Sequence, residues 1–263
     1  MTVTSAGPWH VRRTVDVGAF LLPWAQGVLD ESLRRSSRLD PGSYEIFGQG
    51  SRVNGTYLEP TSDIDLVLML KTPFAYGWEQ FRDDVLAALG ESFVVRMGRR
   101  CLNVDDPDSL FGEMVDILVA TEFRHYTGPG TYEQGVFFRD REGRPIVNFP
   151  KQHRRNGDAK DLRTGGRFKE TVRAAKRVRL RAVREWMIDA PPYLLECLLY
   201  NVPDEIFRGP APLRDALDWL RRRDPAVFAE LPCQNGINRL FGPGPDQWEP
   251  AAAGRIIDVL HQI

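Results

Sequence analysis

The feature that most constrains this chain is a pair of short apolar segments with a glycine-containing turn between them, within residues 44–70. Tyr44–Phe47 and Ile64–Leu70 are rich in isoleucine, valine and leucine, and we predict that both are β-strands. Gly50 and Ser51 follow the first of them. Because small residues let backbone N–H groups approach phosphate oxygens closely, this turn is a candidate phosphate-binding site.

Two aspartates, Asp63 and Asp65, stand at the start of the second predicted strand. Residues two apart in a strand point to the same face, so we expect the two carboxylates side by side. At a separation of roughly 6 Å they would repel by about 3 kcal/mol at an effective dielectric constant of about 20. A hard divalent ion such as Mg²⁺ would remove this repulsion and would also bind substrate phosphates. The alternative is that the aspartates cap a turn and that Gly48–Gly50 forms a simple tight bend.

A third acidic residue lies in a later apolar segment. Glu113–Ala120 is predicted to be a strand, and Asp116 is the charge inside its apolar run. A buried carboxylate is costly unless it is paired or binds a metal ion. We therefore expect Asp116 on a strand next to Asp63 and Asp65, as a third metal ligand. Pairing with an arginine is the alternative.

The composition is that of an ordinary globular protein, with 42% apolar and 27% charged residues in a chain of 263. A net charge of −1 provides no general attraction to nucleic acid or to a membrane surface. No apolar run reaches the ~18 residues of a membrane span, and the N-terminus shows no secretory signal. Cys101, Cys197 and Cys233 share no C-x-x-C spacing, which argues against a zinc site or a disulfide framework and favours a cytoplasmic protein.

The periodicity of the remaining segments changes near residue 150, where a mixed α/β pattern gives way to a helical one. In the first part, helices are predicted at Thr14–Arg38 and Trp78–Leu89, the latter capped by Gly90, and strands at Phe93–Met97, Arg100–Val104, Gly135–Phe138 and Ile146–Phe149. In the second part, the polar segment Pro150–Gly166 is predicted to be a loop, and helices are predicted at Arg167–Met187, Tyr193–Tyr200, Leu213–Arg221 and Trp248–Ile263. We expect two lobes with a cleft between them.

The predicted helix Arg167–Met187 has an apolar face and many cations. Lys169, Arg173 and Lys176 fall at i, i+4 and i+7 and so form one stripe. A charged helix face is usually solvated, but a stripe that faced an acidic metal site would hold a triphosphate, with Lys169 as the first choice. His153, in the predicted loop, is expected to be a hydrogen-bonding residue rather than a general base.

The residues Gly50-Ser51, Asp63-x-Asp65 and Asp116 resemble the motif set of the DNA polymerase β-like nucleotidyltransferase superfamily, over residues 44–120. Further segments are similar to the bacterial cGAS/DncV-like nucleotidyltransferases (CD-NTases), so that this resemblance spans residues 14–201. They are Asn148-Phe149-Pro150-Lys151-Gln152-His153, Asn156, Thr164–Lys169 with Val172-Arg173, and Pro192–Glu196. Asn148 and the triplet Arg184-Glu185-Trp186 are similar to the CdnE branch, several members of which prefer pyrimidine nucleotides. The last sixty residues match no motif.

The resemblance implies an α+β fold with a nucleotidyltransferase core over residues 1–150, a helical lobe over residues 151–263, and an active site in the cleft between them. It implies that Asp63, Asp65 and Asp116 hold two Mg²⁺ ions, with Mn²⁺ as an alternative. It also implies triphosphate binding by Gly50, Ser51, Lys169 and Arg173, and base recognition by Asn148, Arg184 and Trp186. For Trp186, packing in the core is an equally good interpretation.

The activity implied is synthesis of a cyclic di- or trinucleotide from UTP, CTP or ATP for antiphage (CBASS) signalling, by a monomer that acts through a downstream effector. The alternatives are a nucleotidyltransferase with another acceptor, such as a protein or an antibiotic, and a catalytically silent nucleotide sensor.

Overall fold

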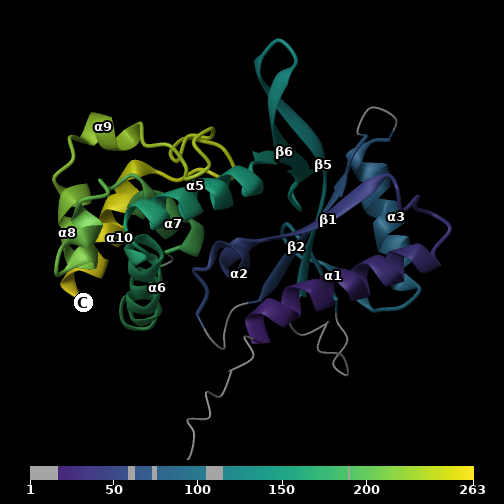
Figure 1. Cartoon of the computed structure of the whole chain (residues 1–263), viewed down its shortest axis with the longest axis horizontal. Helices are drawn as coiled ribbons and strands as arrows, with labels where there is room; N and C mark the ends of the chain where they lie inside the picture. Colours follow the sequence, from purple (N-terminus) through teal and green to yellow (C-terminus); the bar gives the residue numbers. More distant parts are fainter. Residues whose placement is uncertain (1–16, 59–62, 73–75, 105–114, 189) are drawn as a thin grey trace, which may run out of the picture.

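A mixed β-sheet forms one half of the molecule and a group of helices forms the other, as Figure 1 shows. The computed structural model describes residues 17–58, 63–72, 76–104, 115–188 and 190–263. We call residues 17–148 the sheet lobe and residues 150–263 the helical lobe. The predicted α+β architecture with two lobes is confirmed.

The sheet has the strand order β1-β2-β5-β4-β3. In addition, β5 pairs with β6, and β6 pairs with β7. The strands are β1 (Tyr44–Gln49), β2 (Ile64–Leu70), β3 (Val95–Met97), β4 (Leu102–Val104), β5 (Val115–Gly128), β6 (Thr131–Arg139) and β7 (Pro145–Asn148). β2 and β5 are parallel, whereas the other pairs are antiparallel. Asp65 on β2 and Asp116 on β5 therefore lie on two neighbouring strands that run in the same direction.

Two helices cover one face of the sheet, α1 (Val17–Arg35) and α3 (Trp78–Gly90). Leu66 and Leu68 of β2 point to this face and pack in the same apolar cluster as α1 and α3. Val67 and Met69 point to the other face and join a second cluster with β6 and β7. Because side chains alternate along a strand, Asp65 shares the face of Val67 and Met69, away from the two helices.

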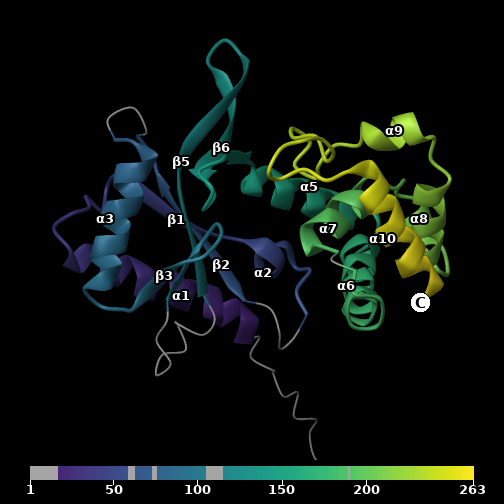
Figure 2. The same ribbon diagram turned by 180° about the vertical axis from the view of Figure 1, so that it is seen from behind.

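The helical lobe has its own apolar core, in which Phe168, Leu194, Leu198 and Phe207 are buried. Its helices are α5 (Pro150–Arg163), α6 (Arg167–Trp186), α7 (Pro192–Tyr200), η1 (Ile206–Arg208), α8 (Pro212–Arg221), α9 (Pro225–Ala229) and α10 (Pro250–Gln262). The short helix α2 (Gly50–Asn54) lies between the sheet and this lobe, as the two opposite views show (Figure 1, Figure 2).

The prediction of a loop at Pro150–Gly166 is wrong, because Pro150–Arg163 forms α5. The buried face of this helix is polar and includes Gln152, His153 and Lys160. A helix that buries polar side chains shows no apolar stripe in its sequence, which is the signal used to recognise an amphipathic helix. Its polar side chains are instead paired: the Lys160 ammonium donates to the Val202 carbonyl oxygen and to Asp204, each at 2.7 Å.

The other predicted strands and helices are confirmed with shifted ends. The predicted cap at Gly90 is wrong, because Gly90 is the last helical residue of α3 and Glu91 is its C-cap. The predicted turn at Gly50 and Ser51 is the start of the helical turn α2. Residues 14–16 of the first predicted helix, and Glu113 and Met114 of the predicted strand, lie outside the described residues. In the described part of the chain, no helix combines the length and apolar character needed to cross a membrane.

Candidate active site

Four polar residues lie in one row across the sheet. Gln49 on β1 is in register with Asp65 on β2, Asp65 with Asp116 on β5, and Asp116 with Asn103 on β4. Residues in register on neighbouring strands point to the same face, so Asp65 and Asp116 lie side by side. Asp63, just before β2, is exposed. The expected pairing of strands that brings the aspartates together is confirmed.

The two central carboxylates are destabilised in their charged forms. Burial, together with the nearby charges of Asp116 and Asp63, raises the pKa of Asp65 to about 7. Burial also raises the pKa of Asp116, with a further contribution from Asp63, while the hydrogen bond donated by the Asn103 amide acts in the opposite direction. This is the electrostatic environment of carboxylates that are arranged around a cation.

Gly50 fits against Asp65 because it has no side chain. Its φ is +73°, and a Cβ atom built there would lie 1.9 Å from Oδ2 of Asp65. Any other residue would therefore have to displace the Asp65 carboxylate and would also adopt a strained backbone. Ser51 follows in α2, and its carbonyl oxygen accepts a hydrogen bond from the Thr56 N–H at 2.9 Å. The glycine that the sequence places at this turn is thus required for steric reasons.

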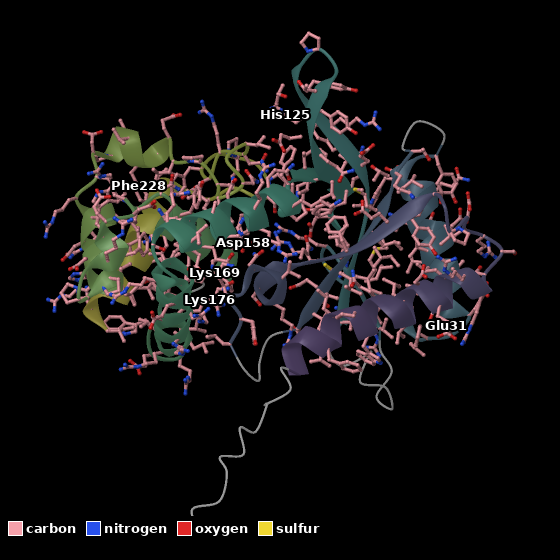
Figure 3. All side chains as sticks on the ribbon, in the orientation of Figure 1. Glu31, His125, Asp158, Lys169, Lys176 and Phe228 are labelled. Carbon is pink, nitrogen blue, oxygen red and sulfur yellow. The ribbon has the colours of Figure 1, made fainter. Side chains whose placement is uncertain are left out.

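The cationic stripe of α6 faces α2 and the loop that follows it. Arg173 donates to the Gly55 carbonyl oxygen at 2.6 Å, and Lys169 pairs with Asp158 at 2.5 Å. Figure 3 shows Asp158, Lys169 and Lys176 on the side of the helical lobe that faces α2. Of the three cations, Lys176 is buried, and its charge lowers the pKa of Asp65.

A buried polar cluster centred on Glu196 of α7 joins the two lobes. Its carboxylate accepts hydrogen bonds from Thr56 Oγ1 at 2.6 Å and Asn54 Nδ2 at 3.3 Å, both in the sheet lobe. From the helical lobe it contacts Lys176 Nζ at 2.5 Å and His153 Nε2 at 2.8 Å. Burial alone would raise the pKa of Glu196, but the bond with His153 and the charge of Lys176 hold this pKa well below its usual range.

Sequence reasoning did not identify Glu196 as a connecting residue, although the signal was present. Glu196 is an acidic residue inside the apolar run PYLLECLLY, which is the same pattern that identified Asp116. The prediction that His153 is a hydrogen-bonding residue is confirmed, but it lies in a helix and is buried rather than in a loop.

A cavity of about 650 Å³ lies between the lobes beside Asp65 and Gly50. The sheet lobe contributes Gln49, Gly50, Asn54, Asp65, Arg100 and residues 145–148 to its wall, and the helical lobe contributes His153, Tyr193, Cys233 and residues 237–239 and 244–248 among others. Arg100 also joins the lobes, since its guanidinium donates to the Pro245 carbonyl oxygen at 3.0 Å and pairs with Asp246 at 2.5 Å. The expected cleft between the lobes is confirmed.

Three stacked rings line this cavity. The rings of His153 and Tyr193 have centroids 5.0 Å apart, and those of Tyr193 and Trp248 have centroids 6.0 Å apart. Aromatic faces are the usual partners of nucleobases. Neither Tyr193 nor Trp248 was identified from the sequence as a cavity residue, because a single aromatic residue in or near a helix does not differ from residues of an apolar core.

The predicted nucleotide-binding residues are not all placed together. Gly50 and Asn148 line the cavity, whereas Ser51, Lys169 and Arg173 lie on α2 and α6 and do not form its wall. Arg184 and Trp186 lie at the C-terminal end of α6, also away from the cavity wall, and Trp186 is 50% exposed. The role of this last pair in base recognition stays a prediction.

The donor set at the aspartates fits a hard divalent cation. Asp65 and Asp116 offer carboxylate oxygens side by side, and Asp63 is close enough to raise the pKa of both. Mg²⁺ is commonly held by one or two carboxylates together with substrate phosphates, so this donor set is sufficient when a triphosphate completes it. Within the described residues, no group of three or more histidine, cysteine or acidic side chains is arranged to hold a metal ion without such help.

Comparison with known proteins gives a consistent set of relatives. Residues 155–263 match the family model of the cGAS/DncV-like nucleotidyltransferase C-terminal helical domain. The cyclic UMP-AMP synthase of Rhodothermus marinus is 34% identical over 84% of this chain and 85% of that protein. The cyclic dipyrimidine nucleotide synthase CdnE of Cecembia lonarensis is 30% identical over 78% of this chain and 75% of that protein.

A solved structure shows the same arrangement of elements. The Rhodothermus marinus CdnE c-UMP-AMP synthase with Apcpp and Upnpp superposes with a TM-score of 0.78 and 30% identity, covering 91% of this chain and 89% of that chain. The chain thus resembles these proteins over both lobes, including the last sixty residues, for which the sequence alone offered no motif.

Proposed function

The chain belongs to the cGAS/DncV-like nucleotidyltransferases, in their CdnE-like branch, and on that basis we propose that it joins nucleoside triphosphates into a cyclic dinucleotide. The observation that carries this proposal is the register of Asp65 with Asp116 next to Gly50, at a cavity bounded by both lobes. The relatives named as cyclic nucleotide synthases support the same activity.

The three aspartates would hold the metal ions of the reaction. Asp63 and Asp65 would hold the ion on the donor triphosphate, and Asp116 would share the ion near the acceptor hydroxyl; we propose Mg²⁺, with Mn²⁺ as an alternative. When bound, two such ions stabilise the attacking and leaving oxygens of an in-line displacement at the α-phosphorus. Asp65 and Asp116 are held in register, and the pKa of each carboxylate is raised. A bound cation would stabilise their charged forms, which otherwise lack a compensating charge.

The other residues bind and orient the substrates. Because Gly50 has no side chain, its backbone lies close to Asp65 and would leave room there for the substrate phosphates. Ser51 offers a hydroxyl at the start of α2. Lys169 and Arg173 provide positive charge next to the α2 loop for the triphosphate. The stacked rings of Tyr193 and Trp248 would form one wall of the base site, and the side chain of Asn148, which lines the same cavity, would hydrogen-bond with the base.

We propose that at least one substrate is a pyrimidine nucleotide. The relatives' names, cyclic UMP-AMP synthase and cyclic dipyrimidine nucleotide synthase, support this choice. By analogy with the family, the product would act on a downstream effector that senses cyclic nucleotides in antiphage signalling, and the enzyme would work as a monomer. This part of the proposal follows from the family and not from a residue of the site.

The test is to incubate the purified protein alone with all four labelled nucleoside triphosphates and Mg²⁺, and to identify the product by mass spectrometry after phosphatase treatment. A cyclic dinucleotide resists phosphatase and needs no second substrate, so its formation separates this proposal from transfer to a protein or an antibiotic. A chain that binds nucleotide but makes no product would instead be a sensor.

The control for this assay is Asp116→Asn. The substitution removes a proposed metal ligand and a half-buried negative charge without changing the shape of the side chain, so we expect product to fall by about a thousandfold or more while the melting temperature is kept or rises. Product formation at nearly the parent rate would remove Asp116 from the site.

A further inference from the structure

Asn103 flanks Asp116 on the side opposite to Asp65. It lies in the middle of β4, in register with Asp116 on β5, and its Nδ2 donates a hydrogen bond to Oδ1 of the Asp116 carboxylate. An ionised carboxylate can only accept hydrogen bonds, so the NH₂ group of Asn103, and not its carbonyl oxygen, faces Asp116. None of the described residues donates a hydrogen bond to Oδ2 of Asp116. Oδ2 is thus the carboxylate oxygen that remains for a cation.

The carbonyl end of the Asn103 amide lies against Gly98, in the turn between β3 and β4. A Cβ atom built on Gly98 would lie 2.6 Å from Oδ1 of Asn103 and 3.0 Å from the carbonyl oxygen of Cys101. The Gly98 N–H donates to the same Cys101 carbonyl oxygen at 2.9 Å, which closes the turn. The missing side chain of Gly98 therefore makes the room that the Asn103 amide occupies. Because its oxygen faces this turn, Asn103 is not placed to be a metal ligand itself.

The β3–β4 hairpin, which carries Asn103, is anchored to its surroundings. In the sheet, β4 pairs with β3 on one side and with β5 on the other. At the turn of the hairpin, the Arg99 carbonyl oxygen accepts a hydrogen bond from the Arg141 N–H at 2.9 Å, in the loop between β6 and β7. The next residue, Arg100, donates to the Pro245 carbonyl oxygen of the helical lobe at 3.0 Å. These contacts hold β4 in place relative to β5.

We infer that Asn103 is a positioning residue, which holds the Asp116 carboxylate in the orientation that binds the cation near the acceptor hydroxyl. Hydrogen-bond partners of metal-binding carboxylates typically change metal affinity or activity by about tenfold to a hundredfold. Asn103 is exposed and Asp116 is half-buried, so the bond between them should contribute little to the stability of the fold. This inference rests on the proposed nucleotidyl transfer and adds to it a residue that acts on metal binding without being a ligand.

The first test removes the hydrogen-bond donor. Asn103→Leu keeps a side chain of similar shape that cannot donate to Asp116. Mn²⁺ binding, followed by electron paramagnetic resonance with an excess of a non-hydrolysable nucleoside triphosphate analogue, counts the bound ions without any turnover. We expect the parent to bind two ions and the variant to bind the weaker ion about tenfold to a hundredfold less tightly. The affinity for the stronger ion, held by the triphosphate with Asp63 and Asp65, and the melting temperature should change little.

The second test leaves Asn103 in place and fills the space behind it. In Gly98→Ala, the new Cβ atom must displace the Asn103 amide, so we expect the affinity for the weaker ion to fall about threefold to tenfold. The matched control is Gly90→Ala at the end of α3, where a Cβ atom would meet nothing within 4 Å. Neither glycine has a positive φ, so backbone strain does not separate the two variants. The control should bind both ions as the parent does.

The outcomes separate this inference from the proposed function. If the parent makes a cyclic product but Asn103→Leu and Gly98→Ala bind the weaker ion as tightly as the parent, the inference is overturned and the proposed function stands. An equal loss of both ions with a lower melting temperature would show a purely structural role and would also overturn the inference, as would a parent that binds no second ion. A parent that makes no cyclic product would overturn the proposed function, and the Mn²⁺ affinities would still decide the inference. Should Asn103→Leu fail to fold, Gly98→Ala decides alone.

Discussion

At the scale of single residues, the site depends on one missing side chain as much as on its charged groups. The Asp65 carboxylate occupies the space where a side chain of Gly50 would be. The backbone of Gly50 is also in the left-handed region, which glycine adopts without strain. The effects of space and of backbone strain can be separated, because Gly130 has nearly the same φ, and a Cβ atom added there would meet nothing within 4 Å.

We predict different results for Gly50→Ala and Gly130→Ala. Both substitutions impose a positive φ on alanine and should each lower the free energy of unfolding by about 1 kcal/mol. Only Gly50→Ala also displaces the Asp65 carboxylate, so it should lower kcat by roughly a hundredfold. Thermal melts and steady-state kinetics of the two variants provide the comparison. Equal kcat values would show that Asp65 tolerates the displacement.

At the scale of secondary-structure elements, Glu196 connects α7 with α5, α6 and the loop after α2. Its buried carboxylate compensates the charge of Lys176 and satisfies the hydroxyl of Thr56. Removal of one partner from a buried ion pair leaves the other charge unpaired and typically costs about 3–5 kcal/mol. The Glu196 carboxylate thus helps to fix α2 and the loop after it relative to the helical lobe.

We predict that Glu196→Gln lowers the free energy of unfolding by about 3 kcal/mol at pH 7. The folded pKa of Glu196 lies below its unfolded value of about 4.3, so its contribution is present above that pH and is lost as the pH falls through the folded pKa. The difference between parent and variant should therefore shrink below about pH 4. Urea denaturation between pH 3 and pH 8, in a range of buffers, measures it.

The matched control is Glu31→Gln, at an exposed pair with Arg35 on α1. Figure 3 places Glu31 at the far end of the sheet lobe. An exposed pair of this kind contributes at most about 1 kcal/mol, so the control should differ little from the parent at every pH. A loss of stability in Glu31→Gln as large as that in Glu196→Gln would contradict a special role for the buried cluster.

The same elements show what the sequence can and cannot predict. β2 and the start of β5 were predictable because each is an apolar run with a costly charge, and their register brings Asp65 and Asp116 together. α5 was not predictable from periodicity because it buries His153 and Lys160 rather than a leucine stripe. The cavity wall at residues 237–239 and 244–248 was not predictable either, since loop residues such as Gln247 and Trp248 become part of the site only through the packing of the helical lobe.

At the scale of the whole molecule, the two lobes are joined by more than the buried cluster. Arg100, between β3 and β4, reaches Asp246 and the Pro245 carbonyl oxygen in the loop before α10. This contact lies at the cavity wall and is partly exposed. A partly exposed ion pair contributes little to overall stability, but it can restrict how far the loop moves from the sheet lobe.

We predict that Arg100→Ala leaves the melting temperature within a few degrees of the parent, yet raises the KM for nucleotides severalfold, because the cavity wall is less well ordered before substrate binds. Amide hydrogen exchange should become faster at Gly242 and Gln247, whose N–H groups bond within this loop. Arg34→Ala, at an exposed pair with Asp30 on α1, is the control and should change neither quantity. Unchanged exchange in Arg100→Ala would show that the loop is held by other contacts.

The order in which the cavity wall is synthesised has a consequence in the cell. The ribosome makes Gly50 and Asp65 nearly two hundred residues before Trp248 and its neighbours on the opposite wall. Over that stretch of synthesis, a nascent chain carries its carboxylates without the opposite wall of the cavity. Translation that stops before residue 233 should give fragments that lack this wall, so we expect premature termination to abolish the activity rather than to leave it partly intact.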